Sequence, residues 1–184
     1  TVDAFKSCED MFFTKWTAGN KEILFPYTST NSAYNNYQFY TNKTVTLEFG
    51  GGGLGVYQGL VDAFFTKNGL PISDTNSGYV EDGFSTAVES RTTKWNEGTG
   101  TLGEITAKGT YNMYCNREPR FYTTVSYNGS WYALAQRPYD FFKNHKDNGY
   151  THDAPQNGYL VRKKVYPYDN PKTGSWLSNR PLWL

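Results

Sequence analysis

An Asn-Gly pair at residues 128 and 129, between two segments with strand-like alternation, constrains the fold of this 184-residue chain more than any other feature. Asn-Gly is the preferred pair at the centre of a type I′ turn, which joins two antiparallel strands directly. The sequence therefore predicts a β-hairpin over residues 121–134. In that register Tyr127 faces Ser130 across the ladder, and Ser126 faces Trp131.

The predicted hairpin has two faces, because residues two apart along a strand share a side of the sheet. One face collects apolar side chains: Phe121, Val125, Tyr127, Tyr132 and Leu134. The other face is more polar and carries Tyr122, Thr124, Ser126 and Trp131. Two outcomes are open for Trp131 and Tyr122. A second layer of the fold covers them, or they form an aromatic platform for a ligand.

Periodicity elsewhere predicts short elements separated by turns. Residues 2–16 have apolar residues at helical spacing and predict a helix that ends before Gly19. Residues 56–69 predict a second helix, with Val56, Leu60 and Phe64 on one side and its end at Asn68-Gly69. Strand patterns occupy residues 22–26, 44–49 and 159–168. The chain is thus expected to be α+β and loop-rich.

The aromatic content is high: 16 Tyr, 12 Phe and 5 Trp make up 18% of the residues. Tyr and Trp provide rigid, amphipathic contact area, so they serve cores and recognition surfaces alike. The formal charge of +1 lacks the basic excess of general nucleic-acid binders, so no nucleic-acid partner is expected. No apolar run of 18 residues occurs, so the sequence predicts no membrane-spanning helix.

No motif for catalysis or for a cofactor stands out. Gly50, Gly52 and Gly55 fit the spacing of a dinucleotide-binding loop, but the second strand and acidic residue of that motif are missing. His145 and His152, with Asp147 and Asp153 nearby, match no zinc pattern and are expected to be solvated loop residues. We therefore predict no enzyme, no metal and no cofactor. Two cysteines, Cys8 and Cys115, leave one disulfide or two separate thiols open.

A charged segment precedes the predicted hairpin. Arg117, Glu118 and Arg120 flank Pro119, which favours an extended conformation at Glu118. Two guanidinium groups around one carboxylate can form a fork-like ion pair. The segment is therefore predicted to be a structural brace.

Four segments in order resemble the SusD-like (RagB/SusD) family of outer-membrane lipoproteins. The signature is "NREPRFYTTVSYNG" at residues 116–129, close to the family's Asn-Arg-Asp/Glu-Pro-Arg-Phe core followed by a strand and Tyr-Asn-Gly. Upstream is "LVDAFFTKNGLPI", and downstream are "NGYLVRKKV" and "RPLWL". The resemblance spans roughly residues 45 to 184, and the opening of the chain fits less specifically.

The resemblance implies a fold of tetratricopeptide-like helices packed against an irregular region of loops, short helices and short strands. This chain is similar to the irregular region and lacks most of the repeat helices. The chain also stops soon after Pro181, where a helix is expected to begin. We therefore expect residues 1–184 to be a single fragment of a SusD-like domain, truncated at both ends.

The resemblance also implies a function. SusD-like proteins are surface-exposed lipoproteins of the outer membrane that bind nutrients without catalysis and pass them to a SusC-like, TonB-dependent transporter. The expected ligand is a glycan, and the expected membrane attachment is a lipid anchor outside this fragment. The alternatives are a glycoside hydrolase or its carbohydrate-binding module, and a piece that only docks to the transporter.

No position of the family motif fixes a ligand contact, so the candidate residues follow from glycan chemistry. Sugar rings stack on aromatic side chains, and polar side chains bind their hydroxyl groups. On this basis the expected ligand-binding residues are Trp95, Asn96, Trp131, Tyr122 and, in a later loop, Trp176.

Overall fold

The computed structural model describes residues 2–13, 19–21, 55–91, 103–132, 137–148, 155 and 157–162. The helices among these residues are short: α1 (Ala4–Phe13), α3 (Gln58–Ala63), the 3-10 helix η2 (Asn112–Tyr114) and α4 (Pro119–Thr124). The strands are β1 (Glu89–Ser90), β2 (Glu104–Thr106), β3 (Val125–Ser126), β4 (Trp131–Tyr132), β5 (Arg137–Pro138) and β6 (Leu160–Val161). The predicted strands at residues 22–26 and 44–49 lie outside these ranges, as does the end of the strand predicted over 159–168.

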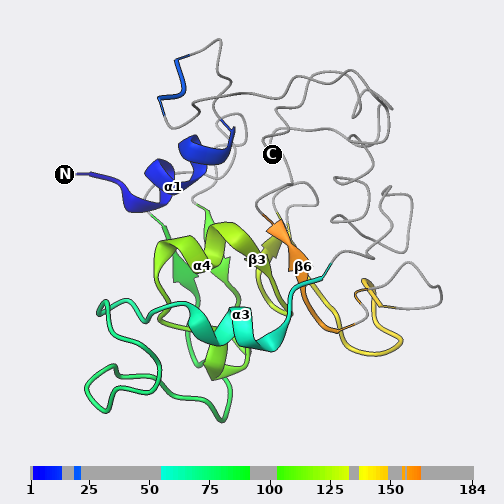
Figure 1. The fold of residues 1–184 in the computed structure, drawn as a ribbon. Coiled ribbons are helices and arrows are strands. Elements are labelled where there is room, and N and C mark those ends of the chain that lie inside the picture. Colours follow the sequence, from blue (N-terminus) through cyan, green and yellow to red (C-terminus); the bar gives the residue numbers. More distant parts are fainter. Residues whose placement is uncertain are drawn as a thin grey trace, which may run out of the picture.

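The strands form three small antiparallel pairs, β1 with β2, β3 with β6, and β4 with β5. Short helices and short antiparallel strands are the α+β, loop-rich architecture that the sequence predicts, so the fold class is confirmed. Among the described residues the longest helix is α1, with 10 residues. Loops and turns make up most of the other residues that the structure describes (Figure 1).

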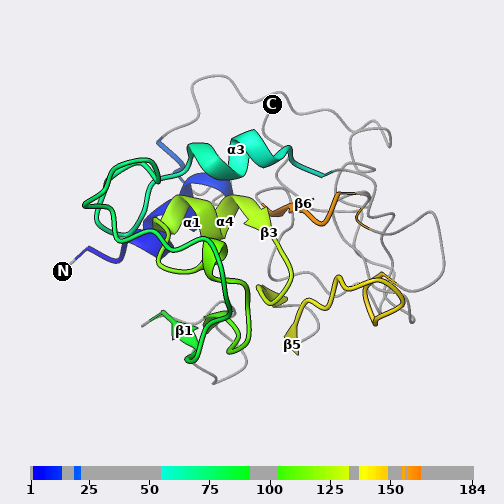
Figure 2. The ribbon, with the colours of Figure 1, turned by 90° about the horizontal axis from the view of Figure 1, so that it is seen from below.

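An aromatic core surrounds α4. Phe121 and Tyr127 are fully buried, and their rings stack with centroids 5.2 Å apart. Tyr114 stacks on the other side of Tyr127 at 4.7 Å. Helix α1 covers this core through Phe5, which stacks on Tyr122 at 5.8 Å. Figures 1 and 2 show α1 and α4 side by side, with α3 along the opposite flank of α4.

A second, smaller cluster lies beyond the hairpin turn. Tyr132 and Tyr139 stack with ring centroids 4.4 Å apart, and Phe141 packs against Tyr139 at 4.8 Å. Leu160 of β6 completes this cluster. Tyr159 belongs to the first cluster and Leu160 to the second, so these neighbouring residues join the two clusters. The pairing of β6 with β3 holds them in place.

Helix α1 confirms the prediction for residues 2–16 over the part that the structure describes. The Asp3 carboxylate accepts a hydrogen bond of 2.9 Å from the Lys6 backbone amide, which is the usual N-cap interaction. Glu9 faces the molecule and forms an ion pair of 2.8 Å with Arg91. Burial is the largest influence on the Glu9 carboxyl and raises its pKa, and Arg91 opposes that shift.

Helix α3 is shorter than predicted, since residues 64–69 are not helical. Phe64 already has an extended conformation, and Gly69 closes a separate turn by donating its amide to the Thr66 carbonyl at 2.9 Å. The buried face also differs: Val61 is fully buried, whereas Leu60 is 46% exposed. The predicted stripe of Val56, Leu60 and Phe64 is therefore wrong at Leu60.

The predicted hairpin is wrong in two respects. Residues 119–124 form helix α4, which begins with Pro119 at its first position, where the fixed φ of proline suits a helix. The two arms also do not pair with each other. Val125 pairs with Val161 and Ser126 with Leu160, while Trp131 pairs with Pro138 and Tyr132 with Arg137.

The turn itself explains why the arms diverge. The Ser130 amide donates to the Tyr127 carbonyl at 3.0 Å, so Asn128 and Gly129 are the central residues, as predicted. Only Gly129 has a positive φ, of 87°, whereas a type I′ turn requires positive φ at both residues. This is the type II pattern, which splays the flanking strands instead of pairing them.

Candidate functional site

An open groove of about 360 Å³ lies beside the Asn128-Gly129 turn. Three separate segments form it: residues 107–110, the turn at 128–129, and residues 137–140, with Lys146 from the loop that follows. Backbone hydrogen bonds hold the segments together. The Ala107 amide donates to the Gly129 carbonyl at 2.8 Å, and the Gly129 amide donates to the Tyr139 carbonyl at 2.9 Å.

Gly129 permits this close assembly. A Cβ atom built on Gly129 would collide with the Oγ1 atom of Thr110, which lines the groove. Its φ of 87° also lies in the left-handed region that side chains other than glycine rarely adopt. The neighbouring Asn128 side chain accepts a hydrogen bond of 2.7 Å from the Phe141 amide and so fixes the chain just after the third segment.

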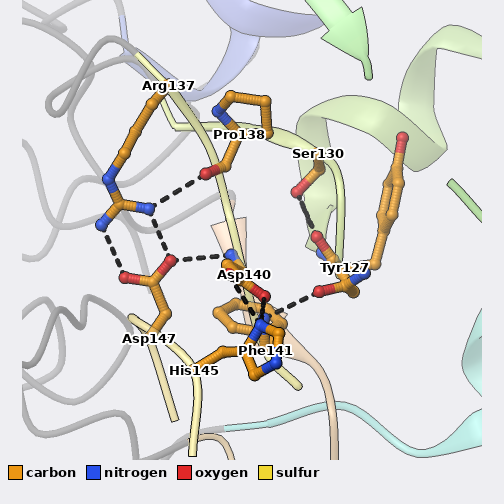
Figure 3. Close-up of polar contacts among 9 residues, drawn as sticks. Tyr127, Ser130, Arg137, Pro138, Asp140, Phe141, His145 and Asp147 are labelled. Carbon is orange, nitrogen blue, oxygen red and sulfur yellow. Dashed lines mark hydrogen bonds and ion pairs between the residues drawn. The ribbon is translucent and has the colours of Figure 1, made fainter. Parts of the chain in front are cut away.

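A buried ion pair supports the third segment, as Figure 3 shows. The Arg137 guanidinium donates to both carboxylate oxygens of Asp147, at 2.6 and 2.7 Å. Asp147 is fully buried and also accepts the Asp140 amide at 2.8 Å. Such a bidentate pair is geometrically specific and rigid. The prediction that Asp147 is a solvated loop residue is therefore wrong, because its carboxylate is the centre of a brace.

Asp140 and His145 form a second, more exposed contact on the same loop. The His145 Nδ1 atom lies 3.0 Å from each carboxylate oxygen of Asp140 (Figure 3). The His145 side chain is 54% exposed and the Asp140 side chain 40%, so solvent screens this pair. His152 and Asp153 lie outside the described residues. In the part of the chain that the structure describes, no group of His, Cys, Asp and Glu side chains could hold a metal ion.

The lining of the groove suits hydrogen bonding to a polar ligand. Cationic side chains come from Lys108, Arg137 and Lys146, and a carboxylate comes from Asp140. Tyr139 contributes to the wall but is only 4% exposed, and burial raises the pKa of its hydroxyl. The groove therefore offers charged and amide groups, and its aromatic ring is largely covered.

Two of the predicted ligand-binding residues are described, and they differ in exposure. Tyr122 is 4% exposed, and its ring packs against Phe5 and Phe121. Its hydroxyl donates to a Glu89 carboxylate oxygen at 2.9 Å and accepts the Arg117 amide at 2.9 Å. Burial raises the pKa of this hydroxyl well above its ordinary value. Tyr122 thus serves the core, and its covered ring offers no platform.

Trp131 is half-buried and packs against the aromatic core. Its carbonyl accepts a hydrogen bond of 2.7 Å from Arg162, and its strand partner is Pro138, which lines the groove. Trp131 therefore lies on the strand next to the groove and keeps part of its surface accessible. Tyr122 and Trp131 do not share a strand face, because Tyr122 is helical. Trp95, Asn96 and Trp176 lie outside the described residues.

The charged segment at residues 117–120 is a brace in which Arg120 has the predicted partner and Arg117 does not. Arg120 donates to both oxygens of Glu118, at 2.9 and 3.0 Å. Arg117 instead turns inward and donates to the carbonyls of Val61 and Phe64, at 2.6 and 2.7 Å. Glu118 has the extended conformation expected before proline.

Two further sequence features have structural roles. Gly55, the last residue of the glycine-rich segment, packs so closely on Asn157 that a Cβ atom would collide with its side chain. Cys8 and Cys115 are both free thiols, which resolves the open alternative in favour of two separate cysteines. Burial raises the pKa of Cys115 to about 11, with a smaller contribution from Glu89, so its thiol stays protonated at neutral pH.

The sequence did not identify the groove, because its walls come from segments separated along the chain. The glycines of Lys108-Gly109 and Asn128-Gly129 each indicate a turn, and these are the local features of the groove that the sequence shows. Nothing local indicated that the two turns meet. The Arg137–Asp147 pair was equally hidden, since ten positions separate its members.

Comparisons with known proteins agree with the sequence motifs. A model of the SusD family matches residues 21–183. The crystal structure of a SusD-like protein from Bacteroides fragilis NCTC 9343 aligns with a TM-score of 0.54 and 26% sequence identity. The alignment covers 92% of this chain and 30% of that protein, so this chain spans less than a third of its length. No curated protein matches the sequence. Among the described residues, no helix is long and apolar enough to cross a membrane.

Proposed function

Because this chain belongs to the SusD family, we propose that it binds glycans without cleaving them and delivers them to a TonB-dependent transporter. Proteins of this family are generally non-catalytic and bind carbohydrate. The observation that carries the proposal is the family match over residues 21–183, which includes every segment of the groove.

The groove and the neighbouring Trp131 supply the two kinds of contact that a glycan needs. Hydroxyl groups of a sugar bind charged and amide side chains, and its C–H face stacks on an aromatic ring. The structure supports Trp131 in this role because the residue is partly accessible and its strand partner Pro138 lines the groove. We propose Trp95, Asn96 and Trp176 as further ligand contacts.

Affinity electrophoresis tests the proposal. We expect the chain to migrate more slowly in a gel that contains its polysaccharide, and Trp131→Ala to reduce that retardation. Stacking of one nucleobase on an aromatic side chain contributes roughly 1–3 kcal/mol. We use this range as the order of magnitude for one sugar ring stacked on Trp131. Phe84→Ala is the matched control, because Phe84 is an aromatic residue 61% exposed that does not line the groove.

Two results would contradict the proposal. If no polysaccharide in a broad panel retards the chain, the binding function is wrong. If Trp131→Ala unfolds the protein while the folded fraction binds normally, Trp131 belongs to the core alone. Melting temperatures of both variants, measured beside the gels, separate these cases.

The hydrolase alternative makes a different prediction from the same panel. An enzyme would release reducing ends with sustained turnover, whereas a binding protein would not. Of the two carboxylates on this loop, Asp147 is engaged by Arg137 and does not line the groove, whereas Asp140 lines the groove and contacts His145. We therefore expect no accumulation of reducing ends on prolonged incubation.

We also propose that the protein is a surface-exposed lipoprotein of the outer membrane and that its partner is a SusC-like transporter. Family membership supports both statements. Co-purification of the transporter with the protein from detergent-solubilised outer membranes is the expected result. Recovery of the protein from the periplasmic fraction instead would contradict the location.

A further inference from the structure

We propose that the groove selects glycans that carry negative charge, as carboxylate or sulfate groups, through Lys108 and Lys146. This inference rests on the proposed function and specifies the class of ligand that the groove takes. It follows from the charges that line the groove and from how each of them is engaged.

Lys108 stands at the tip of a rigid turn in one wall. The Thr110 amide donates to the Ala107 carbonyl at 3.3 Å, and the Thr110 hydroxyl donates to the same carbonyl at 2.8 Å. Gly109 supports the turn with a φ of 85° and donates its amide to the Ser85 carbonyl at 2.9 Å. The base of the Lys108 side chain is therefore fixed at the groove.

Lys146 is held at the groove by its neighbours in the chain. The preceding His145 donates its amide to the Phe142 carbonyl at 2.9 Å, which closes one turn. The following Asp147 is the fully buried partner of Arg137, and its amide donates to the Asp140 carbonyl at 3.0 Å. Lys146 thus projects from a segment that is locked on both sides.

The other charged side chains of the groove, Arg137 and Asp140, have partners within the protein. Asp147 neutralises Arg137 through two hydrogen bonds. The Asp140 carboxylate lies 3.0 Å from His145. Among the residues that the structure describes, neither Lys108 nor Lys146 pairs with a carboxylate. The groove therefore presents two ammonium groups whose charge is available to a ligand.

An anionic substituent on a sugar fits these two groups. Lysine ammonium groups act as mobile point charges, so they can meet a carboxylate or a sulfate without a fixed bidentate geometry. Both lysines are exposed, so each contact is expected to be modest and to weaken as salt increases. A polymer with one charge on each sugar ring offers an anionic group to each of the two lysines.

Matched polysaccharides with and without charge test the inference on the whole 184-residue chain. Polygalacturonate is compared with highly methyl-esterified pectin, and dextran sulfate with dextran. The protein variants are Lys108→Gln, Lys146→Gln, the double variant and Lys143→Gln. Lys143 is the control because it lies on the same loop, is exposed and does not line the groove.

We expect at least one charged polymer to bind more tightly than its neutral counterpart at low salt. Each single groove variant should weaken that binding roughly 2- to 5-fold, the range of an exposed ion pair. The double variant should abolish the preference, and Lys143→Gln should retain it. Preference for polygalacturonate alone identifies carboxylate as the recognised group, and preference for dextran sulfate alone identifies sulfate.

Several results would overturn the inference, and they differ from failure of the proposed function. Equal binding of charged and neutral polymers shows a glycan receptor without charge selection. An equal effect of Lys143→Gln shows that net charge, and not the groove, attracts the polymer. Absence of binding to every polymer in this set and in the wider panel removes the glycan-binding function and the inference together. Because all three lysines are exposed, unchanged melting temperatures are expected for the variants.

Discussion

Arg117 is a buried cation that caps the C-terminal end of helix α3. It is 2% exposed, and its guanidinium donates to the carbonyls of Val61, Phe64 and Met113 at 2.6, 2.7 and 2.9 Å. The last carbonyls of a helix have no partner within the helix, so a donor from elsewhere must satisfy them. Positive charge is also favourable at that end of the helix dipole. Burial is the largest influence on Arg117 and lowers its pKa from the ordinary value.

We predict that Arg117→Met destabilises the protein by about 3 kcal/mol or more. The change leaves several carbonyls without donors, and hydrogen bonds to charged groups contribute about 1.5–3 kcal/mol each. Arg120→Met is the control from the same motif, since its side chain is 60% exposed and, within the described ranges, pairs with Glu118 alone. Its cost should stay below about 1 kcal/mol. Urea denaturation of both variants provides the comparison, and equal losses would contradict the distinction.

The charged motif shows what the sequence reveals about single residues. Residue type and spacing predicted a brace, and the extended conformation of Glu118 followed from Pro119 alone. The separate roles of Arg117 and Arg120 did not follow. They depend on which side of the segment meets α3, and that contact joins residues more than 50 positions apart.

The turn at Asn128-Gly129 determines how the neighbouring elements are arranged. Its type II geometry sends β3 toward β6 and β4 toward β5. The carbonyl and amide of Gly129 then join the segments of the groove, at Ala107 and Tyr139. Gly129, which the sequence places at the tip of a hairpin, thus joins three segments inside the fold. The next residue, Ser130, is only 1% exposed.

We predict that Gly129→Ala costs more stability than Gly109→Ala. Both glycines have a positive φ, of 87° and 85°, so both substitutions carry a similar backbone cost of about 1 kcal/mol or more. Only at Gly129 does the new Cβ collide, with Thr110, whereas nothing lies within 4 Å of a Cβ at Gly109. Thermal melting of the two variants isolates the packing contribution. Equal shifts would show that Thr110 moves aside freely.

Elements with local signals were predictable, and elements set by distant contacts were not. The spacing of apolar residues belongs to α1 itself, so the sequence predicted that helix. Residues 119–124 alternate like a strand, yet Phe121, Tyr122 and Thr123 are all buried because α4 is covered on several sides. Pro119 was the local signal for a helix start. The pairing of β3 with β6 spans about 35 residues and has no local signature.

The two aromatic clusters are expected to unfold together. Tyr159 packs in the first cluster, and the next residue, Leu160 of β6, packs in the second. Strand β6 pairs with β3. Backbone bonds around Gly129 add a second connection. Parts of one small domain that are joined in this way usually unfold in a single cooperative transition.

We predict that Leu160→Ala lowers the free energy of unfolding of both clusters by about 2–5 kcal/mol, the range for a buried leucine. Native-state hydrogen exchange reports this at the Val125 amide, bonded to Phe121, and the Tyr139 amide, bonded to Ser130. Leu60→Ala is the control with the same chemical change at a site 46% exposed. Faster exchange at Tyr139 alone would show two independent units.

The bidentate pair between Arg137 and Asp147 closes a loop at its base, and this has an evolutionary consequence. The outer residues of that loop, Phe142 to His145, are exposed, whereas Asp147 is fully buried and the Arg137 side chain is 17% exposed. Insertions or deletions within residues 142–145 would leave the Arg137–Asp147 ion pair and the groove wall in place. Homologous proteins can therefore differ in the length of this loop without changing the scaffold that carries it.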